Sequence, residues 1–366
     1  NLNMFDHKLS NGMKIAIDVS PLTSGNFLQH RVRGTGFYLN NLKENLLKFH
    51  SENEYEFFDR SKKNHVEADV IHYPYFEPYF LTLPSNIKKN IVVTVHDLTP
   101  LVFKENFPSG IKGKIKWKIQ KRSLEKSEAI ITDSLSSKKD IMRFLDYNSN
   151  KIHVVYLAAA SYFKPQPKIK ATEVIKKFNL PDKFILYVGD VTWNKNLPRL
   201  IEAINKTDYH LVIVGEAFKS KNYDKTNPWN KDLEAAQKLA EKNKRVIPIG
   251  FVENEDLVSL YNAAILFVIP SLYEGFGLPV LEAMQSGCPV VTSQRGSLPE
   301  VAGEAAYYVD PISADSIIEG IKKVYMDEEI RKKLSHIGLK QAEKFSWKKT
   351  VDDTFKVYET VFATNK

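Results

Sequence analysis

Residues 269–284 read Ile-Pro-Ser-Leu-Tyr-Glu-Gly-Phe-Gly-Leu-Pro-Val-Leu-Glu-Ala-Met. The apolar run 264–269 leads into this stretch and predicts a strand buried on both faces. From Leu278 onward the apolar positions have helical spacing, and a proline is tolerated in a first helical turn. Between strand and helix, Gly275 and Gly277 predict a turn where the backbone can come close to a ligand. A strand, a glycine turn and a helix N-terminus together favour an anion, because free N–H groups and the helix dipole converge there.

Two glutamates bracket this turn at a spacing of eight, Glu274 before it and Glu282 within the helix. We expect backbone groups of Gly275, Phe276, Gly277 and Leu278 to hold a phosphate, while the carboxylates accept hydrogen bonds from sugar or ribose hydroxyls. The alternative is an ordinary strand–helix unit whose glutamates are solvated.

The whole stretch resembles the E-x7-E signature of the retaining glycosyltransferases of family 4, and the similarity continues through residues 287–293 and 297–301. The resemblance implies an α/β protein of the GT-B fold, with two Rossmann-like domains whose parallel sheets face each other across a cleft. It also implies a C-terminal helix that crosses back to the N-terminal domain. The run His-Asp-Leu-Thr-Pro-Leu at 96–101 looks like the bacterial mannosyl- and rhamnosyltransferases that build surface polysaccharides.

Length and composition agree with two domains of ordinary size, since 366 residues with 43% hydrophobic and 26% charged residues can bury a core. A single cysteine, Cys288, cannot form an intramolecular disulfide and fits a reducing compartment. The chain has no run of 18 apolar residues, and its first twelve residues do not resemble a signal peptide. We therefore expect a cytoplasmic enzyme.

Strand and helix patterns alternate along the chain, which predicts parallel sheets with ligands at the carboxyl ends of their strands. We predict an acceptor-binding domain over 13–165, a linker over 162–182, a nucleotide-sugar domain over 182–345 and a returning helix over 346–366. Near the N-terminus we predict a loop over 21–36 followed by a helix at 38–49. We expect Ser136 or Ser137 to cap the helix that follows the strand 129–132. In the second domain we predict a polar loop over 218–230. The returning helix has one apolar face, formed by Val351, Phe355, Tyr358 and Phe362.

A nucleotide-sugar donor leaves a diphosphate behind when its sugar is transferred, and the negative charge that develops on this diphosphate needs a cation. Lys195, six residues after the strand-end Gly189, is the leading candidate for that cation. No Asp-x-Asp metal motif occurs, which favours a metal-independent enzyme without a cofactor. The family has a basic pair in this turn, but Asp190 and Asn194 stand where its arginine would be. Either Lys195 works with backbone amides of residues 276–278, or Lys219 assists it.

Further roles follow from the resemblance alone. Glu282 would bind the ribose and Glu274 the transferred sugar, while His96 would contact that sugar or the attacking oxygen. A glycine turn with Gly34 and Gly36 would approach the diphosphate, and Asn196 and Val252 would complete the donor site, the latter beside the base. Family 4 enzymes retain the anomeric configuration, for which front-face attack is the usual proposal. A structural histidine and a plain flexible loop are the alternatives for His96 and the glycine turn.

The net charge of +8 is unevenly placed, because residues 1–165 carry +7 and residues 166–366 carry +1. Residues 111–126 alone hold six lysines and one arginine. This predicts either a solvated helix whose isoleucines pack on the sheet, or a helix that rests on an anionic membrane at the inner face of the plasma membrane, near a glycan or lipid-linked acceptor. No nucleic-acid motif is present. Competing functions are another GT-B enzyme, such as a sugar-nucleotide epimerase, and a two-lobed sugar-binding protein.

Overall fold

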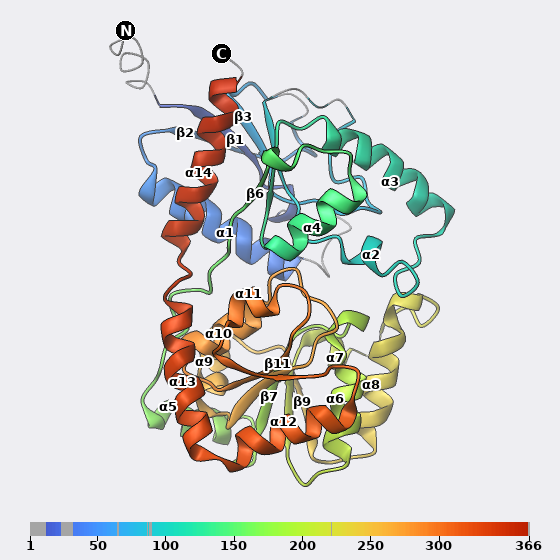
Figure 1. The fold of residues 1–366 in the computed structure, drawn as a ribbon, viewed down its shortest axis with the longest axis vertical. Coiled ribbons are helices and arrows are strands. Elements are labelled where there is room, and N and C mark those ends of the chain that lie inside the picture. The colour runs from blue at the N-terminus through green and yellow to red at the C-terminus, as the bar shows by residue number, and fades with distance from the viewer. Residues whose placement is uncertain are drawn as a thin grey trace. The chain divides into compact units, whose positions relative to one another are not determined.

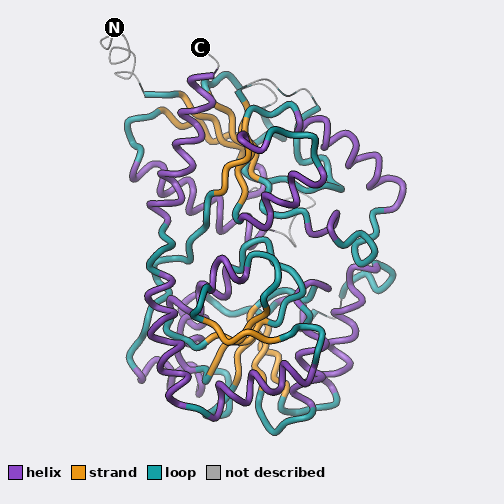
Figure 2. The backbone as a smooth tube through the Cα atoms, in the orientation of Figure 1, coloured by secondary structure: helices purple, strands orange, loops and turns teal. Residues whose placement is uncertain are grey.

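The computed structural model describes residues 12–22, 32–63, 66–85, 87, 90–220 and 222–364. Within them the chain forms two compact units, each built on a six-stranded parallel sheet with helices around it (Figure 1 and Figure 2). The first unit falls within residues 1–102, 109–157 and 346–366, and the second within 103–108 and 158–345. The α/β architecture with two parallel sheets, predicted from the sequence, is confirmed.

The sheet of the first unit has the strand order β2-β1-β3-β4-β5-β6. Its strands are β1 (Lys14–Asp18), β2 (Glu54–Phe58), β3 (Val70–Tyr73), β4 (Ile91–Thr94), β5 (Ala129–Thr132) and β6 (Ile152–Val154). Its helices are α1 (Val32–Phe49), α2 (Thr99–Val102), α3 (Gly110–Glu125), α4 (Leu135–Phe144) and α14 (Trp347–Thr364). Strands β3, β4 and β5 are buried throughout, as expected where helices cover both faces. The edge strand β2 lacks an apolar run and escaped prediction.

Helix α14 packs against α1 and against strands β3, β4 and β5 of this unit. Val351, Phe355 and Tyr358 of the predicted apolar face are buried, and Val361 rather than Phe362 completes it. The Tyr358 hydroxyl lies 2.7 Å from Nδ1 of His72, which is fully buried in β3.

The predicted loop over 21–36 is wrong at its end, because α1 already begins at Val32. Gly34 and Gly36 therefore lie in the first turns of a helix. The packing of buried Tyr38 and Leu39 outweighs the low helix propensity of two glycines. Residues 23–31 of that loop lie outside the described part of the chain.

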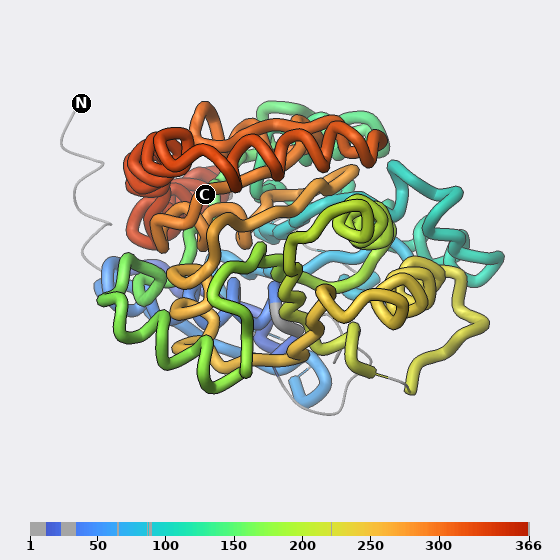
Figure 3. Tube along the Cα trace, turned by 90° about the horizontal axis from the view of Figure 1, so that it is seen from below, coloured from blue at the N-terminus to red at the C-terminus, as the bar shows by residue number. Residues whose placement is uncertain are grey.

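The sheet of the second unit has the order β12-β11-β10-β7-β8-β9. Its strands are β7 (Ile185–Val188), β8 (Leu211–Val214), β9 (Val246–Gly250), β10 (Leu266–Ile269), β11 (Val290–Ser293) and β12 (Ala306–Val309). Its helices are α5 (Lys168–Lys177), α6 (Leu197–Asn205), α7 (Glu216–Lys219), α8 (Lys231–Glu241), α9 (Asn254–Ala263), α10 (Leu278–Gln285), α11 (Leu298–Ala302), α12 (Ala314–Met326) and α13 (Glu328–Ala342). Helix α6 packs between α8 and α12, as the view from below shows (Figure 3).

Two further predictions need correction. The expected linker over 162–182 contains α5, which packs on α9, where Lys177 Nζ lies 2.7 Å from Asp256 Oδ2. The prolines of this segment flank the helix instead of interrupting it, so they do not mark a flexible linker. The cap of α4 is Ser134, whose hydroxyl accepts a 3.0 Å hydrogen bond from the Ser137 N–H. Among the described helices, none is both long and apolar enough to cross a membrane.

Candidate active site

The turn between β10 and α10 has the predicted form. Gly277 is the N-cap of α10 and adopts φ +98°, a left-handed conformation that glycine reaches without strain. In the first turn of α10, Pro279 has no N–H and the Val280 N–H donates to the Gly277 carbonyl at 3.0 Å, which leaves the Leu278 N–H as the helical donor that can face a ligand. The turn therefore presents a helix N-terminus at the carboxyl edge of a parallel sheet, where an anion is favoured.

Lys195 and Glu274, which are 79 residues apart in sequence, form an ion pair beside this turn. Lys195 Nζ lies 2.8 and 2.7 Å from Oε1 and Oε2 of Glu274, and the Ser271 hydroxyl donates a 2.6 Å hydrogen bond to Oε1. The two side chains are 18% and 6% exposed, so the pair is poorly screened by solvent. The structure thus brings the predicted cation and the predicted sugar-binding carboxylate into direct contact.

Backbone contacts fix both halves of this pair. Lys195 ends a short 3-10 turn (Trp193–Lys195) in which the Asn194 side-chain amide donates to the carbonyl of Tyr273 at 3.0 Å. The Leu272 N–H in turn donates to the Asn194 carbonyl at 2.7 Å. Asn194, one of the two positions where the resemblance implies an arginine, therefore joins the two turns.

On the other side, Ser297 and Gly296 support the backbone of Glu274. The Ser297 hydroxyl lies 3.0 Å from the Glu274 carbonyl and 2.8 Å from the Phe276 carbonyl. Gly296 adopts φ +58°, and a Cβ there would lie 2.6 Å from the Glu274 carbonyl oxygen. Only glycine lets this segment approach so closely.

Glu282 occupies the inward side of α10, where the Tyr261 hydroxyl donates a 3.1 Å hydrogen bond to Oε2. Burial raises the pKa of the Glu282 carboxyl to about 7, although this hydrogen bond opposes the shift. This carboxyl therefore holds a proton more readily than an exposed glutamate, and it can act as an acceptor when ionised or as a donor when protonated.

Other predicted donor residues have mainly structural contacts. Asn196 is buried and donates to the carbonyls of Pro270 and Pro311 at 2.9 and 2.7 Å. Val252 is buried just after β9, next to Phe251, which is 52% exposed. The stem of Lys219 lies against Gly250, since a Cβ built there would be 3.0 Å from Lys219 Cδ.

The remaining predicted residues belong to the first unit. His96 follows β4, and its Nδ1 lies 2.7 Å from Oδ2 of the buried Asp133, which follows β5. Burial lowers the pKa of His96, but the charge and hydrogen bond of Asp133 outweigh it and the pKa is raised. Gly34 is exposed at the third position of α1, where the N–H has no intrahelical partner.

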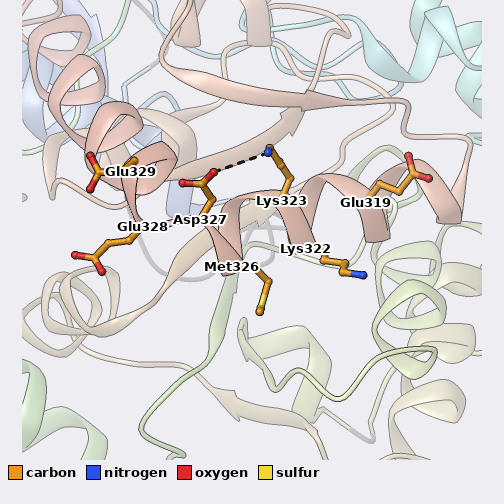
Figure 4. A pocket seen from close by; sticks show the side chains of 7 residues that line it. All are labelled: Glu319, Lys322, Lys323, Met326, Asp327, Glu328 and Glu329. Atoms are coloured by element: carbon orange, nitrogen blue, oxygen red, sulfur yellow. Dashed lines mark ion pairs between the residues drawn. The ribbon is translucent and has the colours of Figure 1, made fainter.

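A depression in the second unit has a different character. It lies where α12 gives way to α13, and Lys323 Nζ there is 3.8 Å from Asp327 Oδ2 (Figure 4). Its lining residues are Glu319, Lys322, Lys323, Met326, Asp327, Glu328 and Glu329. They include none of the residues predicted to act on a donor.

Sequence and structure comparisons now decide the family. The model for glycosyl transferases group 1 matches residues 169–341, and the model for glycosyltransferase family 4 matches residues 24–158. The O-antigen chain mannosyltransferase B of Escherichia coli is 33% identical over 303 residues, covering 80% of this chain and 75% of that protein. This chain is a GT-B glycosyltransferase.

Other relatives of this glycosyltransferase share parts of its length. The serotype-specific mannosyltransferase WbdA of Escherichia coli is 30% identical over 281 residues, which are 75% of this chain and 34% of that protein. Among solved structures, the sucrose-phosphate synthase of Thermosynechococcus elongatus superposes with a TM-score of 0.74 at 19% identity, covering 96% of this chain and 99% of that one. WaaG, a glycosyltransferase of lipopolysaccharide biosynthesis, has a TM-score of 0.66 at 14% identity, with coverage of 95% and 99%.

Several residues that contact predicted residues within either unit of the glycosyltransferase were not themselves predicted. They are Ser271, Tyr261, Gly296, Ser297 and Asp133. Sequence signals existed for two of them, because Ser297 opens a run that resembles the family and Asp133 directly follows a predicted strand. Tyr261 lies in α9 and Glu282 in the next helix, α10, and only the packing of the unit brings their side chains together.

Proposed function

We propose that this chain transfers a mannose- or rhamnose-like sugar from a nucleotide-diphosphate donor to a glycan or lipid-linked acceptor, with retention of anomeric configuration. The observation that carries the proposal is the Lys195–Glu274 pair beside the turn before α10, with Glu282 within that helix. A lysine, a helix N-terminus and two carboxylates are the groups that a diphosphate and its sugar hydroxyls require. The names of the mannosyltransferase relatives support the choice of sugar.

In the proposed reaction, the bond between the anomeric carbon and the donor phosphate breaks as the acceptor hydroxyl attacks from the same face. The leaving phosphate oxygen accepts the acceptor's proton, so no side-chain base is needed. Charge that develops on the diphosphate is stabilised by Lys195 and the α10 N-terminus, while Glu274 and Glu282 orient sugar and ribose. We propose that no metal takes part. Among the described residues, no three or more histidine, cysteine, aspartate or glutamate side chains are grouped to hold one.

Incubation with GDP-mannose, dTDP-rhamnose and UDP-glucose, each with a short oligosaccharide acceptor, tests this function. We expect release of one nucleoside diphosphate and a product whose anomeric configuration, read by NMR, equals that of the donor. Sugar-nucleotide interconversion without diphosphate release would identify an epimerase instead. Binding without turnover of any donor would favour a sugar-binding protein.

We further propose that the enzyme contacts an anionic membrane surface through α3. The isoleucines of this helix do not pack on the sheet, because Ile111, Ile115 and Ile119 are 79%, 55% and 39% exposed. The opposite face is anchored by the buried Gln120, whose Oε1 accepts hydrogen bonds of 2.8 and 2.7 Å from the N–H groups of Thr82 and Leu83.

The exposed face of α3 combines these isoleucines with basic side chains, and its one acidic residue, Glu125, is 25% exposed and pairs with Lys121 at 3.5 Å. Its exposed basic residues are Lys112, Lys114, Lys118, Arg122 and Lys126. Each lysine near an anionic surface contributes about 1 kcal/mol, and each isoleucine that enters the interface adds up to ~2 kcal/mol. This face therefore suits the cytoplasmic leaflet, where a lipid-linked acceptor would lie.

Vesicle sedimentation tests the membrane contact. We expect binding to vesicles with phosphatidylglycerol that weakens at high salt, and weaker binding still for Ile115→Ser. Ile169→Ser is the control, because Ile169 is 60% exposed between two lysines of α5. Equal sedimentation with neutral and anionic vesicles, or equal effects of the two substitutions, would contradict the contact through α3.

A further inference from the structure

The Lys195–Glu274 pair engages both oxygens of the carboxylate and most donors of the ammonium. Two of the three N–H donors of the Lys195 ammonium are directed at Glu274, at 2.8 and 2.7 Å, and Ser271 adds a third hydrogen bond to the carboxylate at 2.6 Å. Yet the proposed function requires Lys195 on the donor's diphosphate and Glu274 on a sugar hydroxyl. In the pair, however, the Lys195 ammonium and the Glu274 carboxylate bind each other.

A carboxylate resembles a phosphate oxygen in charge and in hydrogen bonding, the two properties that decide how a lysine binds it. Both are anionic acceptors, and an ammonium binds either of them as a point charge. We propose that Glu274 occupies Lys195 in place of the donor's diphosphate, and that donor binding exchanges one anion for the other. This inference rests on the proposed function.

The surroundings of Glu274 suit such an exchange. The backbone carbonyls of Tyr273 and Glu274 are held by the Asn194 amide at 3.0 Å and by the Ser297 hydroxyl at 3.0 Å. The Ser271 hydroxyl also remains on Oε1 when Lys195 leaves. The carboxylate therefore stays in place and gains acceptor capacity for a sugar hydroxyl.

The exchange has a consequence for the catalytic cycle. An intact nucleotide sugar supplies an anion to Lys195 and a hydroxyl to Glu274, so both charges keep a partner. A free nucleoside diphosphate supplies only the anion, and Glu274 is left with Ser271 alone. Because a buried charge without its partner is costly, the product binds less tightly than the donor and leaves the site.

Calorimetric titration with inorganic pyrophosphate and with GDP and UDP tests the exchange. Glu274→Gln removes the competing charge but keeps an acceptor for Ser271. We expect its dissociation constant for pyrophosphate to fall about tenfold, which corresponds to ~1.4 kcal/mol. In a Lys195→Met background, the same substitution gives no tightening. Glu304→Gln is the control, since it removes an exposed carboxylate of the same unit.

Glu274→Asp provides a second variant that keeps the net charge. Its carboxylate is one methylene further from Nζ, so the exchange predicts tighter pyrophosphate binding here too. Unchanged or weaker binding by both Glu274 variants would overturn the exchange, as would equal tightening in the Lys195→Met background. If the unsubstituted enzyme binds none of the three probes, the proposed function fails and the exchange with it.

Discussion

Replacing Gly296 by alanine should disturb the site without touching any charged group. Gly296 has φ +58°, and this left-handed conformation costs an alanine about 1 kcal/mol. The added Cβ would also lie 2.6 Å from the Glu274 carbonyl oxygen and 2.9 Å from the Glu274 nitrogen. Since an ordinary contact begins near 3.4 Å, the backbone of Glu274 must move by roughly 0.8 Å. Overpacking of this kind costs a further ~1–3 kcal/mol.

Gly287→Ala is the matched control for the conformational part of this cost. Gly287 has φ +76°, but a Cβ there would meet Ser335 Oγ at 3.5 Å and Pro165 Cγ at 3.7 Å, which are ordinary contacts. We therefore expect Gly287→Ala to lose about 1 kcal/mol and Gly296→Ala about 3 kcal/mol. For a unit of this size, this difference in stability predicts that Gly296→Ala unfolds thermally at a midpoint roughly 4–8 °C below that of Gly287→Ala.

The two variants should differ more in catalysis than in stability. A misplacement of Glu274 by close to 1 Å can reduce transfer on the order of a hundredfold, as measured by nucleoside diphosphate release at saturating donor. Gly287→Ala should transfer sugar at the unsubstituted rate. If both variants melt together and Gly296→Ala transfers normally, Gly296 does not hold the Glu274 backbone.

Three further expectations concern charge and metal. Because the folded Glu282 carboxyl has a pKa of about 7 against an ordinary 4.5, the folded state retains a proton that the unfolded state has lost, and stability falls as pH rises from 4.5 to 7. Glu282→Gln should remove that fall, at most about 3 kcal/mol, in urea unfolding curves recorded across this range. Asp133→Asn should lower the pKa of His96, because it removes the charge that raises this pKa. NMR titration of the His96 imidazole should then show a midpoint at lower pH. An unchanged midpoint would show that the charge of Asp133 does not act on His96. Transfer should persist in excess EDTA, and complete loss with rescue by Mn²⁺ would reveal a metal site.

Much of the fold follows from local sequence pattern. Short apolar runs such as residues 266–269 predicted buried parallel strands, because a strand covered on both faces has no polar alternation. The start of α10 at Leu278 followed from Gly277 and Pro279, whose backbone preferences are intrinsic to the residues. The sequence by itself also predicted Glu274 and Glu282 as site residues, through the resemblance to the E-x7-E signature, and Lys195 from its place six residues after Gly189.

Tertiary structure alone decided which of these groups touch. Lys195 and Glu274 are 79 residues apart and meet because β7 and β10 are neighbours in the sheet, which no local pattern states. The titration of Glu282 likewise depends on burial and on Tyr261 of a different helix. Exposure of the α3 isoleucines was equally undetermined, because a helix with apolar residues on one face can turn that face inward or outward. Packing of the buried Gln120 on the backbone of Thr82 and Leu83 selects the outward orientation, since a buried amide must find hydrogen-bond partners.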